Sequence, residues 1–132
     1  MQKGRKNIGY FGIDVVEEMT IIIPQIPPSL NKYAGRKNVW EYRADKTEWK
    51  NLICLYSKRP KTPYKKATVE ITYFFKTKAR HDPDNYNGKM ILDGLTAAGI
   101  IQDDSFDCIS LTVKGGYDKE NPRTEIEVEE IK

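Results

Sequence analysis

The sequence predicts an α+β fold, α/β in the loose sense, with a single mixed β-sheet covered by two helices. Three observations lead to this class: four strand-like runs of alternating or β-branched residues, one amphipathic helical period, and a second helical segment followed by a glycine. Their order along the chain is β-α-β-α-β-β. The length of 132 residues is enough for one domain with one hydrophobic core.

The first half of the chain holds the first strand and the first helix. Residues 1–18 are expected to be an N-terminal extension of uncertain order, and residues 19–132 a single domain. A strand is predicted at Thr20–Ile23, because three consecutive isoleucines precede the proline-rich stretch 24–31. From about Ala44 to Lys58, apolar residues recur at the spacing of one helix face. They are Trp49, Leu52, Ile53 and Tyr56.

A second strand and a second helix follow. The alternation of apolar and polar residues from Ala67 to Thr77 predicts a strand with one buried side. The next helix is expected to begin near Asp84 or Asn85, because both residue types are good N-caps, and to run to Ala98. Gly99 is then placed to end this helix in the left-handed conformation.

Two further strands complete the chain. Residues 109–113 alternate apolar and polar side chains before a Gly-Gly pair. Residues 125–129 alternate glutamates with Ile126 and Val128 after an Asn-Pro turn. Each alternation predicts a strand with one apolar side.

Composition excludes several classes of protein. Apolar residues make up 39% of the chain and charged residues 31%, which is too apolar for a disordered protein and too charged for a membrane protein. The longest aliphatic run, Ile21–Ile23, is far shorter than the ~20 residues of a membrane span, and no export signal is visible. The expected location is therefore the cytoplasm. Cys54 and Cys108 lie far apart and outside any Cys/His cluster, so we expect neither a disulfide nor a zinc site.

Charge is unevenly distributed along the chain. Residues 1–66 carry 14 Lys and Arg against 6 Asp and Glu, whereas residues 67–132 carry 8 against 13. Such a division would suit a polyanion that is held by one region and processed by clustered carboxylates in the other. A solvated surface with uneven charge is the alternative, and the count alone favours it.

Two pairs of carboxylates follow predicted elements. Asp82 and Asp84 come after a strand, and Pro83 favours extended backbone at Asp82, which would turn both side chains to one side. Asp103 and Asp104 follow the second helix, and a helix packed back along the sheet would return them toward the first pair. Two carboxylates at ~4 Å repel by about 4 kcal/mol at an effective dielectric near 20, so the cluster requires a cation. Hard oxygen ligands favour Mg²⁺ or Mn²⁺ over zinc.

Each of these features has a structural alternative. The Asp-Pro-Asp-Asn run can be a turn with a helix cap, and Asp103-Asp104 a solvated loop. Lys89, early in the second helix, can either place its ammonium beside a metal site or form a surface ion pair with Asp93. His81, the one histidine of the chain, is expected to be solvated. The chain has no phosphate-binding GxxxxGK[ST] loop, which argues against NTP hydrolysis.

Two ordered motifs resemble those of the RusA-type Holliday junction resolvases. The longer is HDPDNYNGKMILDGL at residues 81–95, followed by AGIIQDD at residues 98–104. The shorter, IPPSLN at residues 26–31, is similar to the Pro-Pro-Ser-x-Asn element that follows that family's first strand. The resemblance covers about Thr20 to Ile131.

The resemblance implies a small homodimeric, Mg²⁺-dependent endonuclease, of a kind often encoded by prophages, that cuts four-way DNA junctions by paired nicks. By this resemblance Asp82, Asp84 and Asp104 are the metal-binding carboxylates and Lys89 is the catalytic lysine. Asp103 is an alternative ligand. Lys89 lies five residues after Asp84, one more than in the family pattern, which rotates it by about 100° on a regular helix.

Basic and aromatic residues are the candidates for contacts to DNA. Tyr33, Trp40 and Tyr42 could wedge into a branch point, with packing in a loop as the alternative. The basic candidates are Lys32, Arg36, Lys37, Arg43, Lys46, Lys50 and Arg80.

Two other functions remain open from the sequence. A DNA-binding protein of the same fold could lack catalysis. A metal-dependent nuclease could instead act on other branched nucleic acids, since the choice of junction depends on the shape of the dimer more than on the carboxylates.

Overall fold

The computed structural model describes residues 7–8, 14–33 and 39–132. The helices are α1 (Val39–Tyr56) and α2 (Lys89–Ala97), and a short 3-10 helix, η2, spans Leu30–Tyr33. The strands are β1 (Asn7–Ile8), β2 (Asp14–Ile23), β3 (Ala67–Phe75), β4 (Ile109–Tyr117) and β5 (Arg123–Ile131). From β2 onward the predicted order of strands and helices is confirmed, with η2 as an addition.

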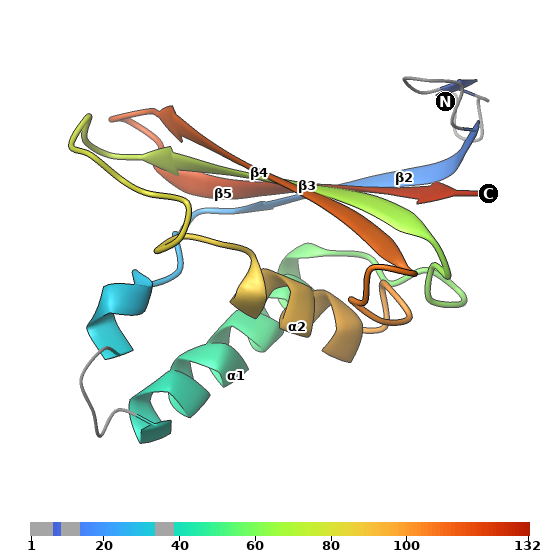
Figure 1. The fold of residues 1–132 in the computed structure, drawn as a ribbon, viewed down its shortest axis with the longest axis horizontal. Coiled ribbons are helices and arrows are strands. Elements are labelled where there is room, and N and C mark those ends of the chain that lie inside the picture. Colours follow the sequence, from blue (N-terminus) through green and yellow to red (C-terminus); the bar gives the residue numbers. More distant parts are fainter. Residues whose placement is uncertain (1–6, 9–13, 34–38) are drawn as a thin grey trace.

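Within the described residues the strands form one mixed sheet in the order β1-β2-β5-β3-β4. β3 and β4 are parallel and start and end together, with Ala67 opposite Ile109 and Phe75 opposite Tyr117. The other strand pairs are antiparallel. Both helices cover the same face of the sheet (Figure 1), so the predicted α+β class is confirmed. β4 forms one edge of this sheet.

The hydrophobic core lies between the sheet and the two helices. Along β3, buried side chains alternate with half-buried ones, as the period of two predicts. Trp49 and Ile53 of α1 are buried, whereas Tyr56, the last residue of the predicted stripe and of α1, is 43% exposed. The buried residues that meet them from the sheet and from α2 include Ile21, Ile23, Val69, Ile71, Ile126, Val128, Ile91 and Leu95.

Two elements begin earlier than predicted. β2 begins at Asp14 instead of Thr20 and pairs with β5 along its length. α1 begins at Val39 instead of Ala44. Many of the additional residues are charged and exposed, such as Glu17, Glu18 and Glu41, and they interrupt the apolar pattern on which the predicted starts depended.

The predicted start of α2 at Asp84 or Asn85 was wrong, because the helix begins at Lys89. The backbone N–H groups of Asn85 and Tyr86 donate to the carbonyl of Asp82 at 3.0 and 3.1 Å, which closes a turn. The side-chain oxygen of Asn87 then accepts the N–H of Lys89 at 2.9 Å and satisfies a free donor of the first helical turn. A local turn thus replaces the first helical turn that the N-cap propensity favoured.

The end of α2 was predicted correctly. Gly99 has a φ of 80°, the left-handed conformation that a residue without a Cβ adopts freely. The N–H of Gly99 donates to the carbonyl of Thr96, and the N–H of Ile100 donates to that of Leu95. These bonds satisfy carbonyls at the helix end and turn the chain toward β4.

The sheet face opposite α1 and α2 is acidic. Glu125, Glu127 and Glu129 alternate with buried residues along β5, and Glu127 lies opposite Glu70 of β3. Lys114 Nζ forms an ion pair with Glu70 at 2.7 Å. Although the Glu127 side chain is exposed, partial desolvation on the sheet, followed by the nearby charges of Glu70, Glu129 and Glu125, raises its pKa. A large part of the acidic charge of the second half therefore lies behind the sheet, away from the two aspartate pairs.

The raised pKa of Glu127 predicts that Glu127→Gln increases the stability of the fold in a pH-dependent manner. Because the native pKa lies above the unfolded one, near 4.3, the native state disfavours the charged form at neutral pH. We expect the variant to raise the free energy of unfolding at pH 7 by less than about 1 kcal/mol, since solvent screens this exposed group. The gain should vanish below about pH 4, where wild-type Glu127 is protonated in both states. Urea unfolding at both pH values, with Glu120→Gln as the control, measures it, and an equal gain at both would contradict the assignment.

Candidate active site

The loop between β3 and α2, which carries Asp82 and Asp84, is fixed by aromatic rings. The ring of His81 stacks on that of Phe75, with centroids 3.8 Å apart and planes within 3°. Tyr86 packs edge-on against Phe75 at 5.0 Å. His81, which was expected to be solvated more than catalytic, is half-buried, and its stacked ring anchors the loop directly before Asp82. No sequence pattern indicates this contact, which joins the loop to the end of β3.

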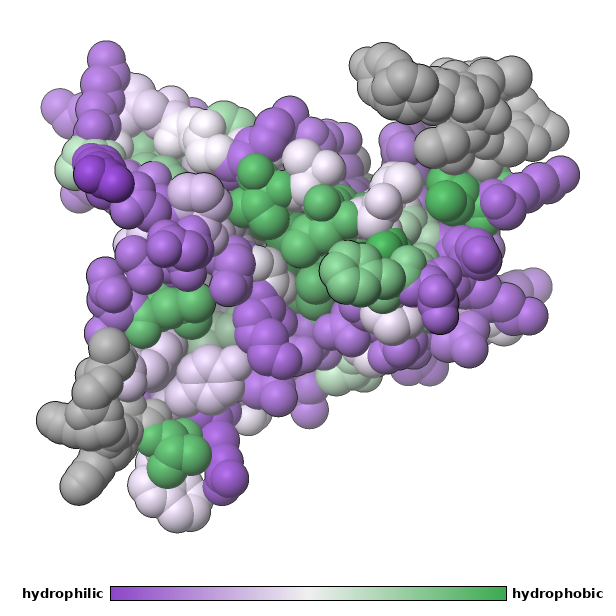
Figure 2. All heavy atoms as spheres, in the orientation of Figure 1, coloured by the Kyte–Doolittle hydropathy of each residue, from purple (hydrophilic) through white to green (hydrophobic). Residues whose placement is uncertain are grey.

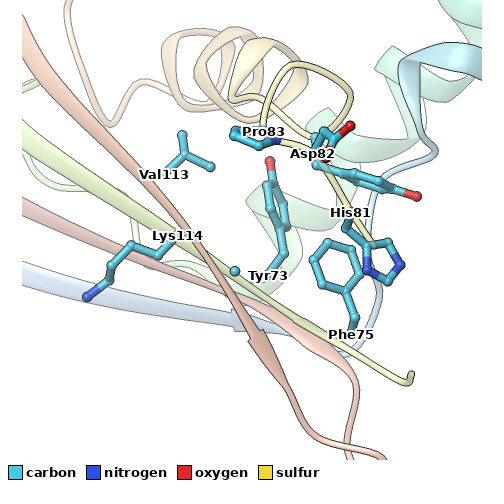
Figure 3. Close-up of a pocket in the computed structure, with 9 residues that line it drawn as sticks. Tyr73, Phe75, His81, Asp82, Pro83, Val113 and Lys114 are labelled. Carbon is cyan, nitrogen blue, oxygen red and sulfur yellow. The ribbon is translucent and has the colours of Figure 1, made fainter. Parts of the chain in front are cut away.

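A cavity of about 80 Å³ lies beneath this loop, and Asp82 and Pro83 line it (Figure 3). Tyr73 points from β3 toward the loop, and its hydroxyl donates to the carbonyl of Asn87. Burial raises the pKa of Tyr73, so it remains a neutral donor. The side chain of Lys114 points away from the cavity (Figure 3). The loop is therefore braced from below by β3.

Asp82 and Asp84 differ in their surroundings. Arg80 Nε lies 3.0 Å from Asp82 Oδ1, and this hydrogen bond, followed by the charge of Asp82, raises the pKa of Arg80. Asp84 is exposed in the turn after Asp82. The expected extended backbone does not continue past Asp82, because the chain turns there. One predicted DNA contact, Arg80, is thus already paired with a predicted metal ligand.

The second carboxylate pair lies at the opposite end of the β3–β4 pair. Asp103 and Asp104 precede Ile109, the first residue of β4, whereas the cavity beside Asp82 is lined by Gly115, near the end of the same strand. At 3.3 Å per residue, this offset is about 20 Å. α2 runs between the two loops (Figure 1). The expectation that α2 returns Asp103 and Asp104 to the first pair was therefore wrong.

The described residues of one chain do not bring all the predicted metal ligands together. Among residues 7–8, 14–33 and 39–132, no three His, Cys, Asp or Glu side chains are grouped so that they could hold a metal ion. Asp82 and Asp84 offer the carboxylate oxygens that Mg²⁺ prefers. Asp103 and Asp104 of the same chain do not join them. The donor chemistry fits Mg²⁺, but one chain does not supply the full set.

Lys89 is held by a carboxylate on its own helix. Its Nζ lies 3.4 Å from Asp93 Oδ2, which is the ion pair that the spacing suggested. The same oxygen lies 3.5 Å from Lys46 Nζ on α1. Sequence spacing does not indicate that Lys46 shares this partner, because the contact requires the two helices to meet.

Three of the predicted DNA contacts line one groove between α1 and α2. Arg43, Lys46 and Lys50 form its α1 side, and the groove has a volume of about 330 Å³. The helices cross closely at Gly94, where a Cβ would lie 2.5 Å from Cδ1 of Ile53. This glycine in an otherwise helical stretch is the one sequence signal that could have indicated the close crossing.

Lys32 and the nearby tyrosines mainly join η2 to α1. Lys32 Nζ lies 2.8 Å from Asp45 Oδ2 and 3.6 Å from Glu41 Oε2. The hydroxyl of Tyr33 donates to Asp45 at 2.6 Å, and its ring packs edge-on against Tyr42 at 5.1 Å. Burial alone would raise the pKa of Asp45, but its hydrogen bonds from Lys32 and Tyr33 outweigh burial and lower it. Packing is therefore the role that the structure gives Tyr33 and Tyr42.

Trp40 and two basic candidates remain. Trp40 is 74% exposed, and the guanidinium of Arg43 lies 5.4 Å from its ring centroid. Its side chain is thus accessible for a contact to DNA. Arg36 and Lys37 lie outside the described residues.

The family of the chain is decided by a comparison with protein families. The model of the family described as endodeoxyribonuclease RusA matches residues 23–129. The chain belongs to the RusA endodeoxyribonuclease family. It is therefore a nuclease of the class that resolves Holliday junctions. None of the curated proteins compared with it matches.

The RusA match contains every feature of the site described above. It begins at Ile23, the last residue of β2, and includes both aspartate pairs, Lys89 and the groove between the helices. No helix in the described part of this RusA-family chain is long and apolar enough to cross a membrane.

Proposed function

We propose that this RusA-family protein is a Mg²⁺-dependent endonuclease that resolves four-way DNA junctions by paired nicks, with Mn²⁺ as a substitute ion. One observation supports this most: a braced loop with Asp82 and Asp84 and a groove with three basic side chains both lie on the helix side of the sheet. Carboxylates suit a hard metal ion and basic side chains suit DNA phosphates. We also infer recombination or repair as the process, a prophage origin and a cytoplasmic location, by resemblance to the family.

The chain's own residues have distinct roles in this proposal. Asp82 and Asp84 hold the metal ion with carboxylate oxygens, and Asp104, or Asp103 in its place, completes the ligand set. When bound, the ion supplies a water of lowered pKa and neutralises charge on the scissile phosphate. Lys89 stabilises the charge that develops on the phosphoryl group or protonates the leaving 3′ oxygen.

A homodimer would complete this ligand set. Because one chain places its two carboxylate pairs about 20 Å apart along the strands, the second pair has to come from another copy. A two-fold axis beside β4 would pair this edge strand with the same strand of the second chain, running antiparallel. The start of one β4, after Asp103 and Asp104, would then lie beside the end of the other, near Asp82. Such a dimer has two equal sites, as paired nicks require.

The β4 edge has the surface that such a contact needs. Apolar side chains gather over the middle of this face of the molecule (Figure 2). Phe106, in the loop before β4, is fully exposed at 103%, and Leu111 of β4 is 41% exposed. Exposed apolar groups beside an open strand edge are typical of an interaction surface.

Charge is unevenly distributed along the same edge. The loop before β4 is acidic, with Asp103, Asp104 and Asp107. The end of β4 has basic neighbours: Lys78 Nζ lies 5.0 Å from the ring centroid of Tyr117, and Arg80 lies two residues before Asp82. Antiparallel pairing would bring the acidic start of one strand beside Lys78 and also beside Asp82 and Asp84, so a cation bound between the two aspartate pairs would offset their repulsion.

Cleavage of a panel of DNA substrates tests the proposed function. We expect Mg²⁺-dependent cutting of a synthetic four-way junction at two symmetric positions, and slow or absent cutting of three-way, duplex and single-stranded DNA. Binding without cleavage would favour the non-catalytic alternative. Equal cutting of three-way junctions or flaps would favour a nuclease for other branched nucleic acids.

The groove predicts a change in the salt dependence of binding. If about six phosphates are neutralised, the slope of log affinity against log salt is near −5 for duplex arms. Replacing both Lys46 and Lys50 by Ala should reduce the slope by about one unit per lost contact, while sequence preference at the cut is kept. Titration of labelled junction over a salt series measures this. The matched control replaces the exposed Lys58 and Lys61, which lie outside the groove. An equal change of the salt slope in both double variants would show that the groove is not the DNA-binding surface.

A further inference from the structure

We propose that Asp93 is a positioning residue, which holds the ammonium of Lys89 beside a phosphate-binding groove formed by Arg43, Lys46 and Lys50. This inference rests on the proposed function and links the catalytic role of Lys89 to DNA binding in the groove. The nuclease assignment gives Lys89 a role at the reacting phosphate and the groove a role in holding DNA. The shared carboxylate connects them, because Lys89 and Lys46 both lie within 3.5 Å of its Oδ2.

The environment of Asp93 differs from that of a surface ion pair. Its side chain is only 18% exposed, and its Oδ2 atom is buried without a hydrogen-bond partner among the described residues. A buried carboxylate oxygen without a hydrogen bond carries a desolvation cost, which is larger when the group is charged. The two ammonium groups, on α1 and α2, are what offsets this cost. The carboxylate of Asp93 is therefore stabilised by one lysine from each helix and not by solvent.

The close helix crossing makes this arrangement possible. At Gly94, next to Asp93, a Cβ would come within 3.6 Å of the Cα of Lys50, so α2 lies directly on α1. That approach brings Lys46 to the carboxylate on the neighbouring helix. Lys46 and Lys89 are 48% and 58% exposed, so both retain access to a ligand in solvent.

Charge in the groove remains positive after this pairing. One carboxylate offsets only one of the two lysines that share it, and Arg43 and Lys50 add to the surplus. Asp93 also reduces the repulsion between Lys46 and Lys89, which would otherwise drive their ammonium groups apart. A DNA phosphate would thus meet cations that are already held in place. This lowers the rotamer freedom that the lysine side chains lose when a phosphate binds.

Asp93→Asn tests the proposal, because it keeps the shape of the side chain and removes its charge. We expect the rate of junction cleavage to fall on the order of tenfold to a hundredfold, as for a misplaced catalytic group. Junction affinity, measured at the same salt with Ca²⁺ in place of Mg²⁺, should stay the same or increase, because a negative charge leaves the groove. A merely structural aspartate would instead weaken binding and thermal stability together with the rate. Asp93→Glu, which keeps the charge, should recover part of the rate.

A double-mutant comparison decides whether Asp93 acts through Lys89. Lys89→Ala alone should slow cleavage on the order of a hundredfold, and adding Asp93→Asn should slow it less than about twofold further, because the group to be positioned is gone. Glu48→Gln removes an equal charge from an exposed position on α1 and should leave rate and affinity unchanged.

The outcomes separate this proposal from the nuclease assignment. Additive losses in the double variant would overturn the positioning role while the nuclease function stands. A Lys89→Ala variant that cuts at the normal rate would overturn it as well, because Lys89 would then have no role in the site. A wild-type chain that cuts no branched DNA would overturn the proposed function, and this inference with it.

Discussion

Asn in place of Asp82, Asp84 or Asp104, one position at a time, is expected to abolish cleavage of four-way junctions. Each change removes a charged oxygen donor that a hard metal ion requires, and it leaves the size of the side chain almost unchanged. The fold should be kept, and stability should hold or rise, because a like charge leaves the pair. Junction binding should also persist, because the basic side chains of α1 are untouched.

Gel assays of cleavage and binding in the same buffers measure this result. Asp107→Asn is the matched control, since Asp107 is exposed in the same loop as Asp104 and is outside the proposed ligand set. Substantial cleavage by all three variants would show that these carboxylates do not form the site.

Disrupting the β4 edge should have a comparable effect without touching a carboxylate. We expect the combined variant Phe106→Ser and Leu111→Lys to sediment as a monomer and to lose at least a hundredfold in cleavage rate, because in the proposed dimer Asp103 and Asp104 reach Asp82 only from the second chain. The fold should survive, since Phe106 is fully exposed and Leu111 is partly exposed in the single chain.

An exposed apolar residue elsewhere provides the control for this variant. Leu55 of α1 is 73% exposed and lies far from β4 in the sequence, and Leu55→Ser should change neither the sedimentation nor the rate. A fully active monomer, or a β4 variant that remains dimeric and active, would contradict the proposed interface.

Much of the fold follows from the sequence because local patterns decide it. The apolar spacing of Trp49 and Ile53 predicts the buried stripe of α1, and the alternation along β3 predicts its buried side. Gly99 ends α2 as predicted, because its conformation depends on a single residue. The start of α2 was missed because Asp82 accepts two backbone hydrogen bonds in a turn, which competes with the helix over a few residues.

The arrangement of the carboxylates could not be predicted from element order alone. Whether Asp104 returns to Asp82 depends on the direction in which β3 and β4 pair. Their parallel register makes α2 a crossover, and a crossover places the loops before and after it at opposite ends of the strands. The alternation of residues contains no information about that direction.

The contacts of Asp93 illustrate the same limit at the level of side chains. Its pair with Lys89 follows from a spacing of four residues on one helix. Its pair with Lys46 depends on the crossing of α1 and α2 at Gly94, which is a tertiary contact. The stacking of His81 on Phe75 is likewise set by how the loop folds back on β3.

If the carboxylate site is shared between two chains, mixing two inactive variants should restore activity. The Asp82→Asn variant and the Asp104→Asn variant are purified separately and mixed in equal amounts, and exchange of chains between dimers is verified with two different affinity tags. Each mixed dimer then has one site with both substitutions and one site with neither, so a shared site predicts single nicks in four-way junctions at roughly a quarter of the wild-type rate. No recovery after verified exchange would show that each chain builds its own site, which contradicts the shared arrangement.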